Sequence, residues 1–556
     1  MRTGGQILVD QLKAHGTRQV FCVPGESYLA VLDALHGSGI ETVICRQEGG
    51  AAYMAEASGK MTGRPGIVMV TRGPGATNAS GGIHVAAQDS TPLIMFVGQV
   101  ARDMKDREAF QELDYKAVFG SIAKWVVEID RPDRIPELVS RAFHVATQGR
   151  PGPVVIALPE DMLTEKTEVA DARAFAPVIM QPGADQMQEL RRRLLAARRP
   201  LIIAGGSGWT AEGVADLARF SENFELPVAV SFRRQMLFPA DHPNFAGDIG
   251  IGPNPKLLAR VKAADLVVLI GGRLSEMPSQ SYTLLDIPGD GERLIHIHPG
   301  AEELNKLYRA GLGILATPHA FAAAAAALPK PNAVAWAGEA RTAHADYVAW
   351  SDTSGITTPG TLQMAGVMAH LKQAMPADTI FCNGAGNYAT WVHRFWPFRS
   401  FASQLAPTSG TMGYGVPAAV AAKLLAPERE VVAFAGDGCF LMNGQEFATA
   451  MQYDLPIIVV VVDNGMYGTI RMHQEREYPG RVSATDLKNP DFAALARAYG
   501  GHGETVRTTA EFAPALARVR ASGRPAILHC LIDPEAITPV RSLSDIRAAS
   551  RRGGGA

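Results

Sequence analysis

Short runs of aliphatic and β-branched residues alternate with amphipathic or small-residue stretches along most of the chain. In the first third these runs cover residues 20–23, 42–45, 66–71, 93–97 and 154–158, and helical patterns such as residues 48–60 lie between them. Continuous apolar runs of this length are typical of strands buried on both faces. Strands that alternate with helices predict parallel α/β units.

The same alternation recurs twice more, separated by polar, weakly periodic stretches at residues 165–185 and 329–359. These stretches are expected to be linkers. The later strands are predicted at residues 201–204, 227–232, 266–270 and 294–297, and at 379–382, 431–435, 456–462 and 526–531. The fold class is therefore α/β, with three doubly wound parallel-sheet domains at residues 1–165, 186–330 and 358–540, followed by a mobile tail at 541–556.

Composition narrows the class of protein. The chain has 556 residues, with 53 Lys and Arg against 55 Asp and Glu, so it carries no basic surplus for nucleic acid. Its longest apolar runs, such as Leu455–Val462, are far shorter than the ~20 residues of a membrane helix. The N-terminal segment has helical spacing rather than the pattern of a secretion signal. We expect a cytoplasmic protein without nucleic-acid or membrane partners.

The segment 436–468 carries the clearest chemical signal. The strand at residues 431–435 ends at Gly436-Asp437-Gly438, a helix is predicted from about Gly444 to Tyr453, and the next strand ends at Asp463-Asn464. Because the two strands of a βαβ unit are parallel, Asp437 and Asn464 emerge at the same sheet edge. Oxygen ligands and close-approach glycines there favour Mg²⁺ with a diphosphate.

This segment resembles the thiamine-diphosphate fingerprint, GDG followed by an Asn-Asn turn, with Asp463 in place of the first Asn. The resemblance extends over the whole chain and is strongest to the acetolactate synthase (acetohydroxyacid synthase) branch. It implies pyrimidine-binding, central and diphosphate-binding domains, with Asp437, Asn464 and the Met466 carbonyl as metal ligands. The cofactor contacts that it implies are Gly25, Asn387, Gly410, Met412, Gly436, Asp437, Gly438, Cys439, Asn464, Met466, Tyr467 and Gly468.

The N-terminal domain matches the same branch. RQEGGAAYMAEA at residues 46–57 looks like the segment that carries the catalytic glutamate, which falls on Glu48. A buried glutamate with a raised pKa suits protonation of the pyrimidine ring. Without the resemblance, Glu48 is an ordinary acid at a helix N-terminus.

Further motifs resemble the branch and place side chains near the reacting carbons. GPGATN at residues 73–78, QDSTPLIMFVGQV at 88–100 and AFQE at 109–112 imply substrate contacts by Gln99, Phe110 and Gln111. SGTMGYGVPAA at residues 409–419 places Met412 as the apolar fulcrum that bends the cofactor. In isolation, the Gly-Pro-Gly is a turn and the Met is core filler.

Four departures from the branch bear on substrate. Thr469 and His473 replace a Met and a pocket-shaping Trp, Glu160 replaces a channel Lys, and Glu26 stands where a small residue is usual. If Glu26 and Glu160 face the cleft, they disfavour a second anionic acceptor by charge repulsion. Otherwise they are solvated surface acids. His84 and His473 are candidate proton shuttles or structural residues.

The central domain contains GGSGWTA at residues 205–211, a weak match to a dinucleotide-binding turn. Arg233 stands where an acid for the ribose is needed, which disfavours an NAD-dependent oxidoreductase. The resembling synthases hold a structural FAD in this domain. Arg273 of their pattern is kept, but the last turn is His296-Ile297-His298. Whether FAD binds is left open.

The resemblance implies a thiamine-diphosphate- and Mg²⁺-dependent enzyme that decarboxylates a 2-keto acid, expected to be pyruvate, and joins the product to a second carbonyl. It further implies a homodimer or homotetramer with active sites at the subunit interface, and a regulatory small subunit is not indicated. The alternative is a non-synthase thiamine enzyme: a decarboxylase, a lyase, or a carboligase with an aldehyde or acyl-CoA acceptor. A non-enzymatic scaffold is disfavoured by Glu48, Asp437 and Asn464.

Overall fold

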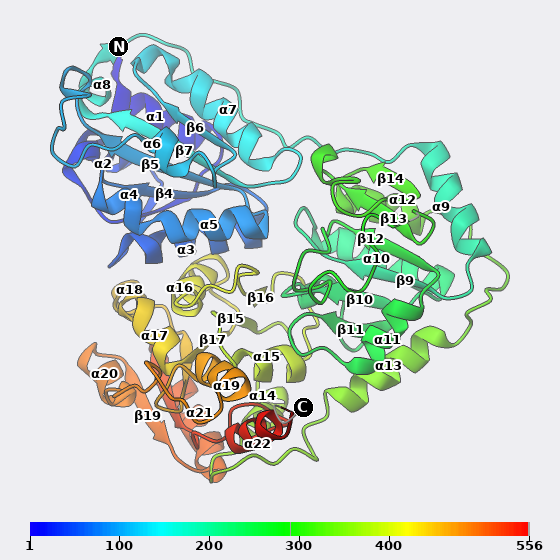
Figure 1. Ribbon diagram of the computed structural model, residues 1–556. Coiled ribbons are helices and arrows are strands. Elements are labelled where there is room, and N and C mark those ends of the chain that lie inside the picture. The colour runs from blue at the N-terminus through cyan, green and yellow to red at the C-terminus, as the bar shows by residue number, and fades with distance from the viewer. Residues whose placement is uncertain (290, 554–556) are drawn as a thin grey trace. The chain divides into compact units, whose positions relative to one another are not determined.

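The computed structural model describes residues 1–289 and 291–553 and contains three six-stranded parallel sheets. The chain forms two compact units. One comprises Met1–Val178 with Val420–Leu425, and the other comprises Ile179–Ala419 with Ala426–Ala556. The first unit holds one sheet and the second holds two (Figure 1). The predicted fold class, α/β with three doubly wound parallel sheets, is confirmed.

The sheet of the first unit has the strand order β3-β2-β4-β5-β7-β6. Its strands are β2 (Gln19–Cys22), β3 (Glu41–Ile44), β4 (Gly66–Val70), β5 (Leu93–Gln99), β6 (Trp125–Glu128) and β7 (Pro153–Pro159). Its helices are α1 (Gly4–Ala14), α2 (Leu29–Leu35), α3 (Glu48–Thr62), α4 (Pro74–Asn78), α5 (Ser80–Asp89), α6 (Tyr115–Phe119), α7 (Ile135–Thr147) and α8 (Glu160–Thr164). Helix α1 packs against α2 and α7, whereas α3 packs against α5. The short strands β1 (Arg2–Thr3) and β8 (Lys166–Thr167) pair antiparallel beside this sheet.

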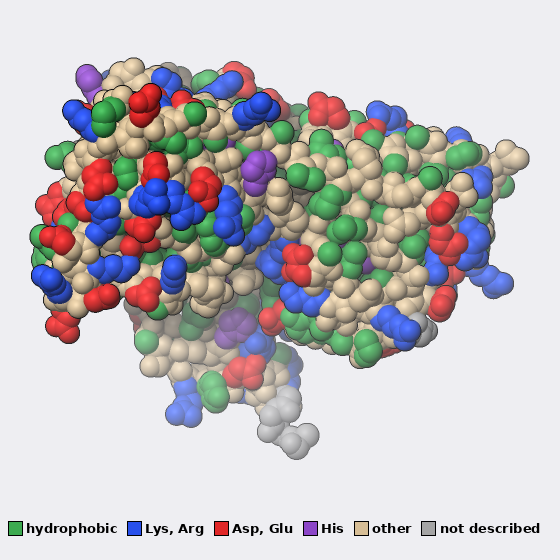
Figure 2. Space-filling view, turned by 90° about the horizontal axis from the view of Figure 1, so that it is seen from above, with side chains coloured by type: hydrophobic (Ala, Val, Ile, Leu, Met, Phe, Trp, Pro, Cys, Tyr) green, Lys and Arg blue, Asp and Glu red, His purple; other side chains and the backbone are tan. Residues whose placement is uncertain are grey.

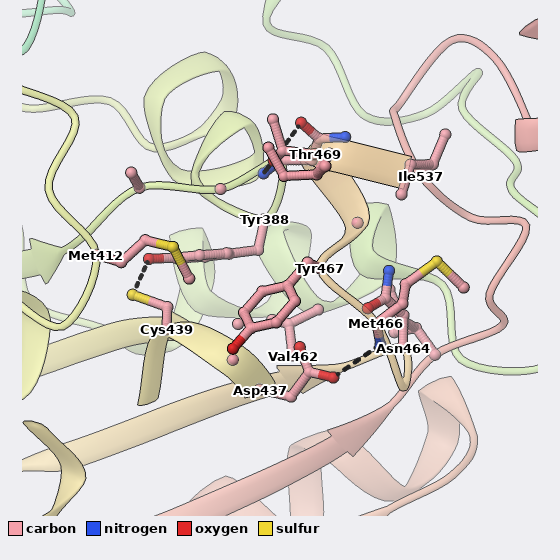
Figure 3. Close-up of a pocket in the computed structure, with 18 of the residues that line it drawn as sticks. Tyr388, Met412, Asp437, Cys439, Val462, Asn464, Met466, Tyr467, Thr469 and Ile537 are labelled. Atoms are coloured by element: carbon pink, nitrogen blue, oxygen red, sulfur yellow. Dashed lines mark hydrogen bonds between the residues drawn. The ribbon is translucent and has the colours of Figure 1, made fainter. Parts of the chain in front are cut away.

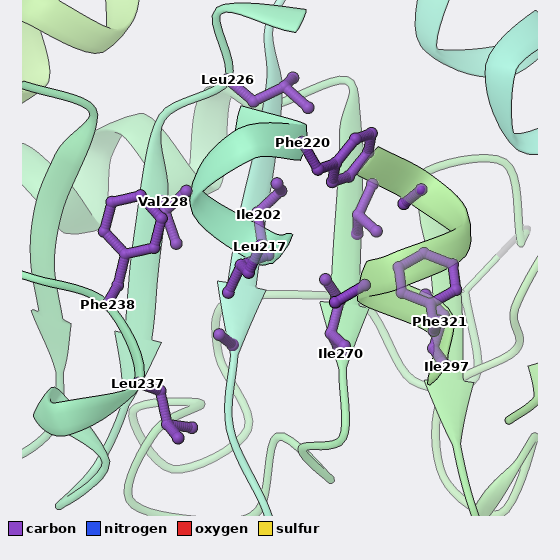
Figure 4. Packing of buried hydrophobic residues seen from close by; sticks show 14 of the residues in the cluster. Ile202, Leu217, Phe220, Leu226, Val228, Leu237, Phe238, Ile270, Ile297 and Phe321 are labelled. Carbon is purple, nitrogen blue, oxygen red and sulfur yellow. The ribbon is translucent and has the colours of Figure 1, made fainter. Parts of the chain in front are cut away.

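The central sheet, in the second unit, has the order β11-β10-β9-β12-β13-β14. Its strands are β9 (Pro200–Ala204), β10 (Val228–Ser231), β11 (Phe245–Ile249), β12 (Leu266–Ile270), β13 (Leu294–His298) and β14 (Leu312–Leu315). Its helices are α9 (Ala184–Ala196), α10 (Ala211–Phe224), α11 (Pro255–Ala263), α12 (Pro318–Ala326) and α13 (Glu339–Trp350). Figure 4 shows Ile202, Ile270 and Ile297 of the strands facing side chains of α10 and α12, which form the core on this face.

The C-terminal sheet has the order β16-β15-β17-β18-β20-β19. Its strands are β15 (Ile380–Asn383), β16 (Gln404–Leu405), β17 (Val431–Gly436), β18 (Ile458–Asp463), β19 (His502–Val506) and β20 (Ala526–Leu531). Its helices are α14 (Met364–Ala374), α15 (Ala389–Phe395), α16 (Gly415–Leu425), α17 (Asp437–Asn443), α18 (Phe447–Gln452), α19 (Gly468–Glu477), α20 (Phe492–Ala498), α21 (Thr509–Ser522) and α22 (Leu543–Gly553). Buried polar contacts join this sheet to the central one: Gln404 donates to Gln235 at 2.5 Å, and Gln235 N–H donates back at 2.8 Å.

Acidic and basic side chains are interspersed over the face shown in Figure 2, in keeping with the near-zero net charge of −2. Among the described residues, no helix has both the length and the apolar character that crossing a membrane requires.

Two expectations about connecting segments, the linker at 329–359 and the tail, need correction. The expected linker at 329–359 contains α13, which packs on β11 through buried Ala340 and Ala343. The apolar residues that α13 buries are small and few, so the sequence does not indicate a helix there. The helix predicted from about Gly444 to Tyr453 is present as a 3-10 turn, Gly444–Glu446, followed by α18; the sequence analysis missed the separate helix α17, which begins at Asp437 directly after β17.

The expected mobile tail contains a packed helix. Leu543 and Ile546 of α22 join Ile537 in a small buried cluster, with Met472 of α19 packed against it. Arg547 donates to both carboxylate oxygens of Glu475, at 2.7 and 2.9 Å. Residues 554–556 of this expected tail lie outside the described residues. Helix α22 therefore braces α19.

The Glu475 carboxylate makes this brace sensitive to acid. It is buried, also accepts from Arg471 and from the Gly480 N–H, and the Arg547 hydrogen bonds lower its pKa from 4.5 to about 2. A carboxyl whose folded-state pKa is lowered stabilises the fold above pH 4.5, and this contribution is lost as the pH falls toward 2. We expect Glu475→Gln to lower the thermal unfolding midpoint by about 3–10 °C at pH 7. The deficit should shrink below pH 4.5. Glu477→Gln, on the exposed face of α19, is the matched control and should change little.

Candidate functional site

A cavity of about 240 Å³ lies in the C-terminal domain, where β15, β17 and β18 end. Because these strands are parallel, their carboxyl ends lie along one sheet edge, the usual ligand-binding edge of such sheets. Residues that follow each strand line it together with α19 (Figure 3). The structure thus brings together eleven of the predicted cofactor contacts: Asn387, Gly410, Met412, Gly436, Asp437, Gly438, Cys439, Asn464, Met466, Tyr467 and Gly468.

Asp437 is the buried charge of this cavity. It is the first residue of α17 and only 3 % exposed, and it accepts from the Met466 N–H at 3.2 Å and from Asn489 at 2.7 Å. Burial, together with the neighbouring Asp463, raises the pKa of Asp437 from 3.8 to about 6. A raised pKa indicates a carboxylate whose charge the protein itself does not compensate, and a cation would supply that compensation.

The side chains around Asp437 suit a hard cation. Asn464 and Met466 lie on the same wall of the cavity as Asp437 (Figure 3), and they offer an amide and a backbone carbonyl oxygen. The described residues contain no metal-type cluster of three or more His, Cys, Asp or Glu side chains. One carboxylate with neutral oxygens matches Mg²⁺, which keeps waters and phosphate oxygens in its shell.

Two residues behind the cavity were missed by sequence analysis. Asn489 donates to Asp437 at 2.7 Å and to Asp463 at 2.8 Å, so one amide bridges the two carboxylates. His529 of β20 pairs with the other oxygen of Asp463 at 2.9 Å. Burial alone would raise the pKa of Asp463, but hydrogen bonds from His529 and from the Gly465 N–H lower it. Neither Asn489 nor His529 belongs to a motif with a recognisable spacing.

The turn that carries Asn464 and Met466 is held by a second segment. Tyr467 N–H donates to the Thr485 carbonyl and Leu487 N–H donates to the Gly465 carbonyl, both at 2.8 Å. These bonds pair the turn with residues 485–487 in an antiparallel bridge and position Asn489.

Two glycines around the end of β17 leave space beside the backbone that aromatic rings fill. A Cβ at Gly438 would lie 2.5 Å from the Tyr467 ring, and one at Gly436 would lie 2.9 Å from the Tyr388 ring. Both rings line the cavity, and Tyr388 donates to Cys439 Sγ at 3.1 Å. The glycines therefore let two aromatic rings lie directly against the backbone that surrounds Asp437.

The start of α19 forms the opposite wall. Thr469 donates to Asn387 Oδ1 and accepts from the Asn387 N–H, both at 3.0 Å (Figure 3). His473, one turn further, lies 2.7 Å from Arg476 and is not among the residues that line the cavity. Of the two substituted positions on this helix, Thr469 alone lines the cavity.

The remaining predicted residues lie in the first unit, at the carboxyl edge of its sheet. Glu48 is the first residue of α3 and accepts from Asn78 at 3.0 Å. In this chain it is half-buried, not buried as expected. Gly25 follows β2, and a Cβ there would lie 2.5 Å from Thr71. His84 is exposed on α5.

Gln99 and Gln111 hold the loop at 108–113. Gln99 is buried, and its amide donates to the Leu113 carbonyl and accepts from the Val100 N–H, both at 3.0 Å. Gln111 has a φ of 65°, and a Cβ on Gly73 would lie 2.8 Å from it. Phe110 projects from this loop with 72 % of its surface exposed. The Gly-Pro-Gly motif thus leaves room for the loop that presents Phe110.

The two unusual acids, Glu26 and Glu160, share one cation. Arg72 is buried and its guanidinium contacts Glu26 and Glu160, each at 3.1 Å. Its Nε donates to the Phe110 carbonyl at 3.2 Å. Two carboxylates and one guanidinium leave a single net negative charge, so repulsion of an anionic acceptor is weaker than two unpaired acids would give.

Comparisons with known families account for this arrangement. Three sequence models of one family match the chain: the thiamine pyrophosphate enzyme N-terminal TPP binding domain at residues 2–118, the central domain at 187–325, and the C-terminal TPP binding domain at 384–530. The chain is a thiamine pyrophosphate enzyme. The cavity lies within the part that matches the C-terminal TPP binding domain, and Glu48 lies within the part that matches the N-terminal one.

Within this family of thiamine pyrophosphate enzymes, the chain is similar over nearly its whole length to acetolactate synthase large subunits. It is 30 % identical to a probable large subunit of Methanocaldococcus jannaschii, over 97 % of this chain and 93 % of that one. It is 33 % identical to the large subunit of Lactococcus lactis, over 90 % and 87 %. It is 30 % identical to the isozyme 2 large subunit of Escherichia coli, over 95 % of each.

Proposed function

We propose that this thiamine pyrophosphate enzyme decarboxylates a 2-keto acid, with pyruvate as donor, and joins the remaining two-carbon unit to a second 2-keto acid, as an acetolactate synthase does. The observation that carries the proposal is the end-to-end similarity to acetolactate synthase large subunits. The cavity around Asp437 supports it, because its residues suit a metal-bound diphosphate.

Asp437, Asn464 and the Met466 carbonyl would hold Mg²⁺, and the backbone at Gly436 and Gly438 would contact the diphosphate. When bound, thiamine diphosphate supplies the nucleophilic carbon and takes up the electron pair that remains when CO₂ leaves. Met412, which lines the cavity, would support the bend of the cofactor.

Glu48 would hold a proton at the pyrimidine ring nitrogen, while Phe110, Gln111 and Gln99 would shape the space for the substrate. In the proposed assembly, a homodimer or homotetramer, the N-terminal domain of one chain meets the C-terminal domain of another. Glu48, half-buried in one chain, would then become buried against the partner, which gives it the dry surroundings of a general acid.

The direct test is product analysis. With pyruvate, thiamine diphosphate and Mg²⁺, the purified protein should form acetolactate and CO₂. Formation of acetaldehyde alone, or no turnover on a panel of 2-keto acids, would contradict the synthase assignment.

A second candidate is a carboligase with an aldehyde or acyl-CoA acceptor. Two features favour it. Thr469 on the cavity wall is hydrogen-bonded to Asn387, and His473, which replaces the Trp of the synthases, lies away from the cavity. The same assay with added aldehydes separates the two: a mixed product in place of acetolactate would select this candidate.

Asn489 provides a prediction about the metal site. Replacing it by Leu removes the only side-chain amide that bridges Asp437 and Asp463 among the described residues, and the two carboxylates then repel each other. Outer contacts of this kind are worth about 10–100-fold in metal affinity. We expect Asn489→Leu to weaken Mn²⁺ binding by that factor, measured from the EPR signal of free Mn²⁺ with thiamine diphosphate present. Asn332→Leu, at an exposed position, should leave binding unchanged.

We propose that the central domain binds no FAD. The indole of Trp209 donates to the Gly205 carbonyl at 2.8 Å, and a Cβ at Gly206 would lie 1.8 Å from the Gly271 carbonyl oxygen, so the loops after β9 and β12 pack on each other. Strand β13 ends at His298, whose pKa burial lowers to about 4, so a neutral ring stands at this strand end. We expect the purified protein to show no flavin absorbance; flavin released on denaturation would contradict this.

A further inference from the structure

Buried Arg72 lies at the centre of a polar cluster at the carboxyl edge of the first sheet. It follows the end of β4 by two residues, and its side chain is 9 % exposed. Glu26, which follows β2, and Glu160, which follows β7, each contact its guanidinium at 3.1 Å. Because β2, β4 and β7 are parallel strands of one sheet, their carboxyl ends bring the three charges together. Arg72 is therefore held from two sides by residues at the ends of core strands.

The third contact of Arg72 is with the loop that carries Phe110. Nε of Arg72 donates to the Phe110 carbonyl at 3.2 Å, so the bond fixes the backbone of the loop and leaves the ring free to project. A guanidinium is planar and donates in several fixed directions, so one side chain can hold two carboxylates and a carbonyl at once. Arg72 thus joins this loop to the ends of β2 and β7.

The loop at 108–113 has a backbone that needs such support. Glu108 and Gln111 have φ values of 54° and 65°, in the left-handed region that residues with a Cβ seldom adopt. Such residues persist only where surrounding contacts hold them in place. Gln99 holds the Leu113 carbonyl at the end of the loop, and the guanidinium holds the Phe110 carbonyl directly before Gln111. Without the guanidinium, this part of the loop is expected to relax.

We propose that Arg72 is a positioning residue for the second substrate, because it fixes the loop at 108–113 so that Phe110 lies beside the second 2-keto acid. The inference rests on the proposed function, in which Phe110 shapes the space for the substrate. Glu26 and Glu160 then serve to orient Arg72 rather than to repel an anionic acceptor. When the loop is displaced, the acceptor is held less well. The two-carbon unit then takes up a proton and leaves as acetaldehyde, instead of forming a bond to the acceptor.

Hydrogen–deuterium exchange tests the positioning without turnover. The full chain, with thiamine diphosphate and Mg²⁺ present, is compared with Arg72→Met, and a peptide covering residues 106–113 is followed. The amides of Ala109 and Glu112 are hydrogen-bonded within this loop, so their exchange reports its order. We expect the variant to exchange at least about tenfold faster in this peptide than the parent.

Arg2→Met is the matched control. Arg2 lies in the same unit and, like Arg72, contacts two carboxylates and one main-chain carbonyl, those of Asp10, Asp171 and Val169. Its loss should leave exchange of the 106–113 peptide at the parental rate.

A triple variant separates positioning from charge balance. In Arg72→Met alone, Glu26 and Glu160 lose their shared cation, so their repulsion could by itself disturb the loop. The variant that combines Glu26→Gln, Arg72→Met and Glu160→Gln has neither this repulsion nor the guanidinium, and it has no uncompensated charge that would hinder folding. We expect the loop to exchange fast in it as well. Exchange at the parental rate in either variant would show that Arg72 does not position the loop.

Product analysis connects the loop to the acceptor. With pyruvate as the only substrate, we expect Arg72→Met to lower the ratio of acetolactate to acetaldehyde by about tenfold, while CO₂ release changes much less. A loss of stability alone would lower both products equally. If the loop exchanges faster but the ratio stays at the parental value, the proposal is wrong. An absence of acetolactate from the parent would contradict the proposed activity alone, because the exchange experiment tests Arg72 without turnover.

Discussion

Asp437→Asn is expected to reduce turnover by a factor on the order of 10³, because the proposed metal ligand would contribute several kcal/mol to cofactor binding and charge stabilisation. The substitution keeps the shape of the side chain and an oxygen that can accept from Asn489, but it removes the charge that Mg²⁺ would neutralise. Because burial raises the pKa of Asp437 to about 6, the parent already bears a desolvation cost that the uncharged variant avoids. The apoprotein of the variant should therefore be as stable as the parent or more so.

The measurements are the steady-state rate and the thermal midpoint without metal. Asp454→Asn is the matched control, since Asp454 is exposed and its φ of 51° is one that Asn readily adopts. A variant with parental turnover at limiting Mg²⁺ would show that Asp437 does not bind the metal.

Glu48→Gln should lower turnover by about 10²–10⁴, the range that general acid–base catalysis contributes. The amide keeps the size of the side chain and its place on the first turn of α3, beside Asn78, but it cannot exchange a proton with the pyrimidine ring. We expect the affinity for thiamine diphosphate, followed by circular dichroism, to change far less than the rate.

Glu137→Gln, on the exposed face of α7, serves as control and should retain full activity. If Glu48→Gln turned over at the rate of the parent, Glu48 would be an ordinary helix N-terminal acid. If instead its cofactor affinity and rate fell together, Glu48 would act mainly in binding.

The strands that sequence analysis found are mostly interior ones, and the strands it missed lie at sheet edges. Strands such as β5 and β18 are buried at every position and therefore appear as unbroken apolar runs. The missed strands β6, β11, β14, β16 and β19 each have one neighbour. β6, β14 and β19 are largely half-buried, so their sequences mix polar and apolar residues, whereas β11 and β16 are mostly buried. Their pairing comes from the adjacent strand rather than from their own hydrophobic pattern.

The candidate site divides in a similar way. Asp437, Asn464 and Glu48 lie in contiguous motifs at strand ends, where parallel topology alone brings neighbours together. Asn489 reaches Asp437 from a loop 52 residues away, and nothing in the spacing indicates it. Likewise, the sequence shows Glu26 and Glu160 as added charges, but their shared partner Arg72 becomes evident only when the ends of β2, β4 and β7 are assembled.

The order of strands in the C-terminal sheet has a consequence for protein synthesis. The turn after β18, which is proposed to hold the metal, is supported by His529 of β20, which contacts Asp463, and β18 pairs with β20 along its whole length. Since β20 ends at Leu531, a nascent chain that has emerged from the ribosome only as far as α19 has every motif residue but lacks the strand that sets the turn. We therefore expect ribosome-stalled chains that end before β20 to fold the first sheet yet fail to retain cofactor. The cofactor would then bind only when synthesis of the chain is nearly complete.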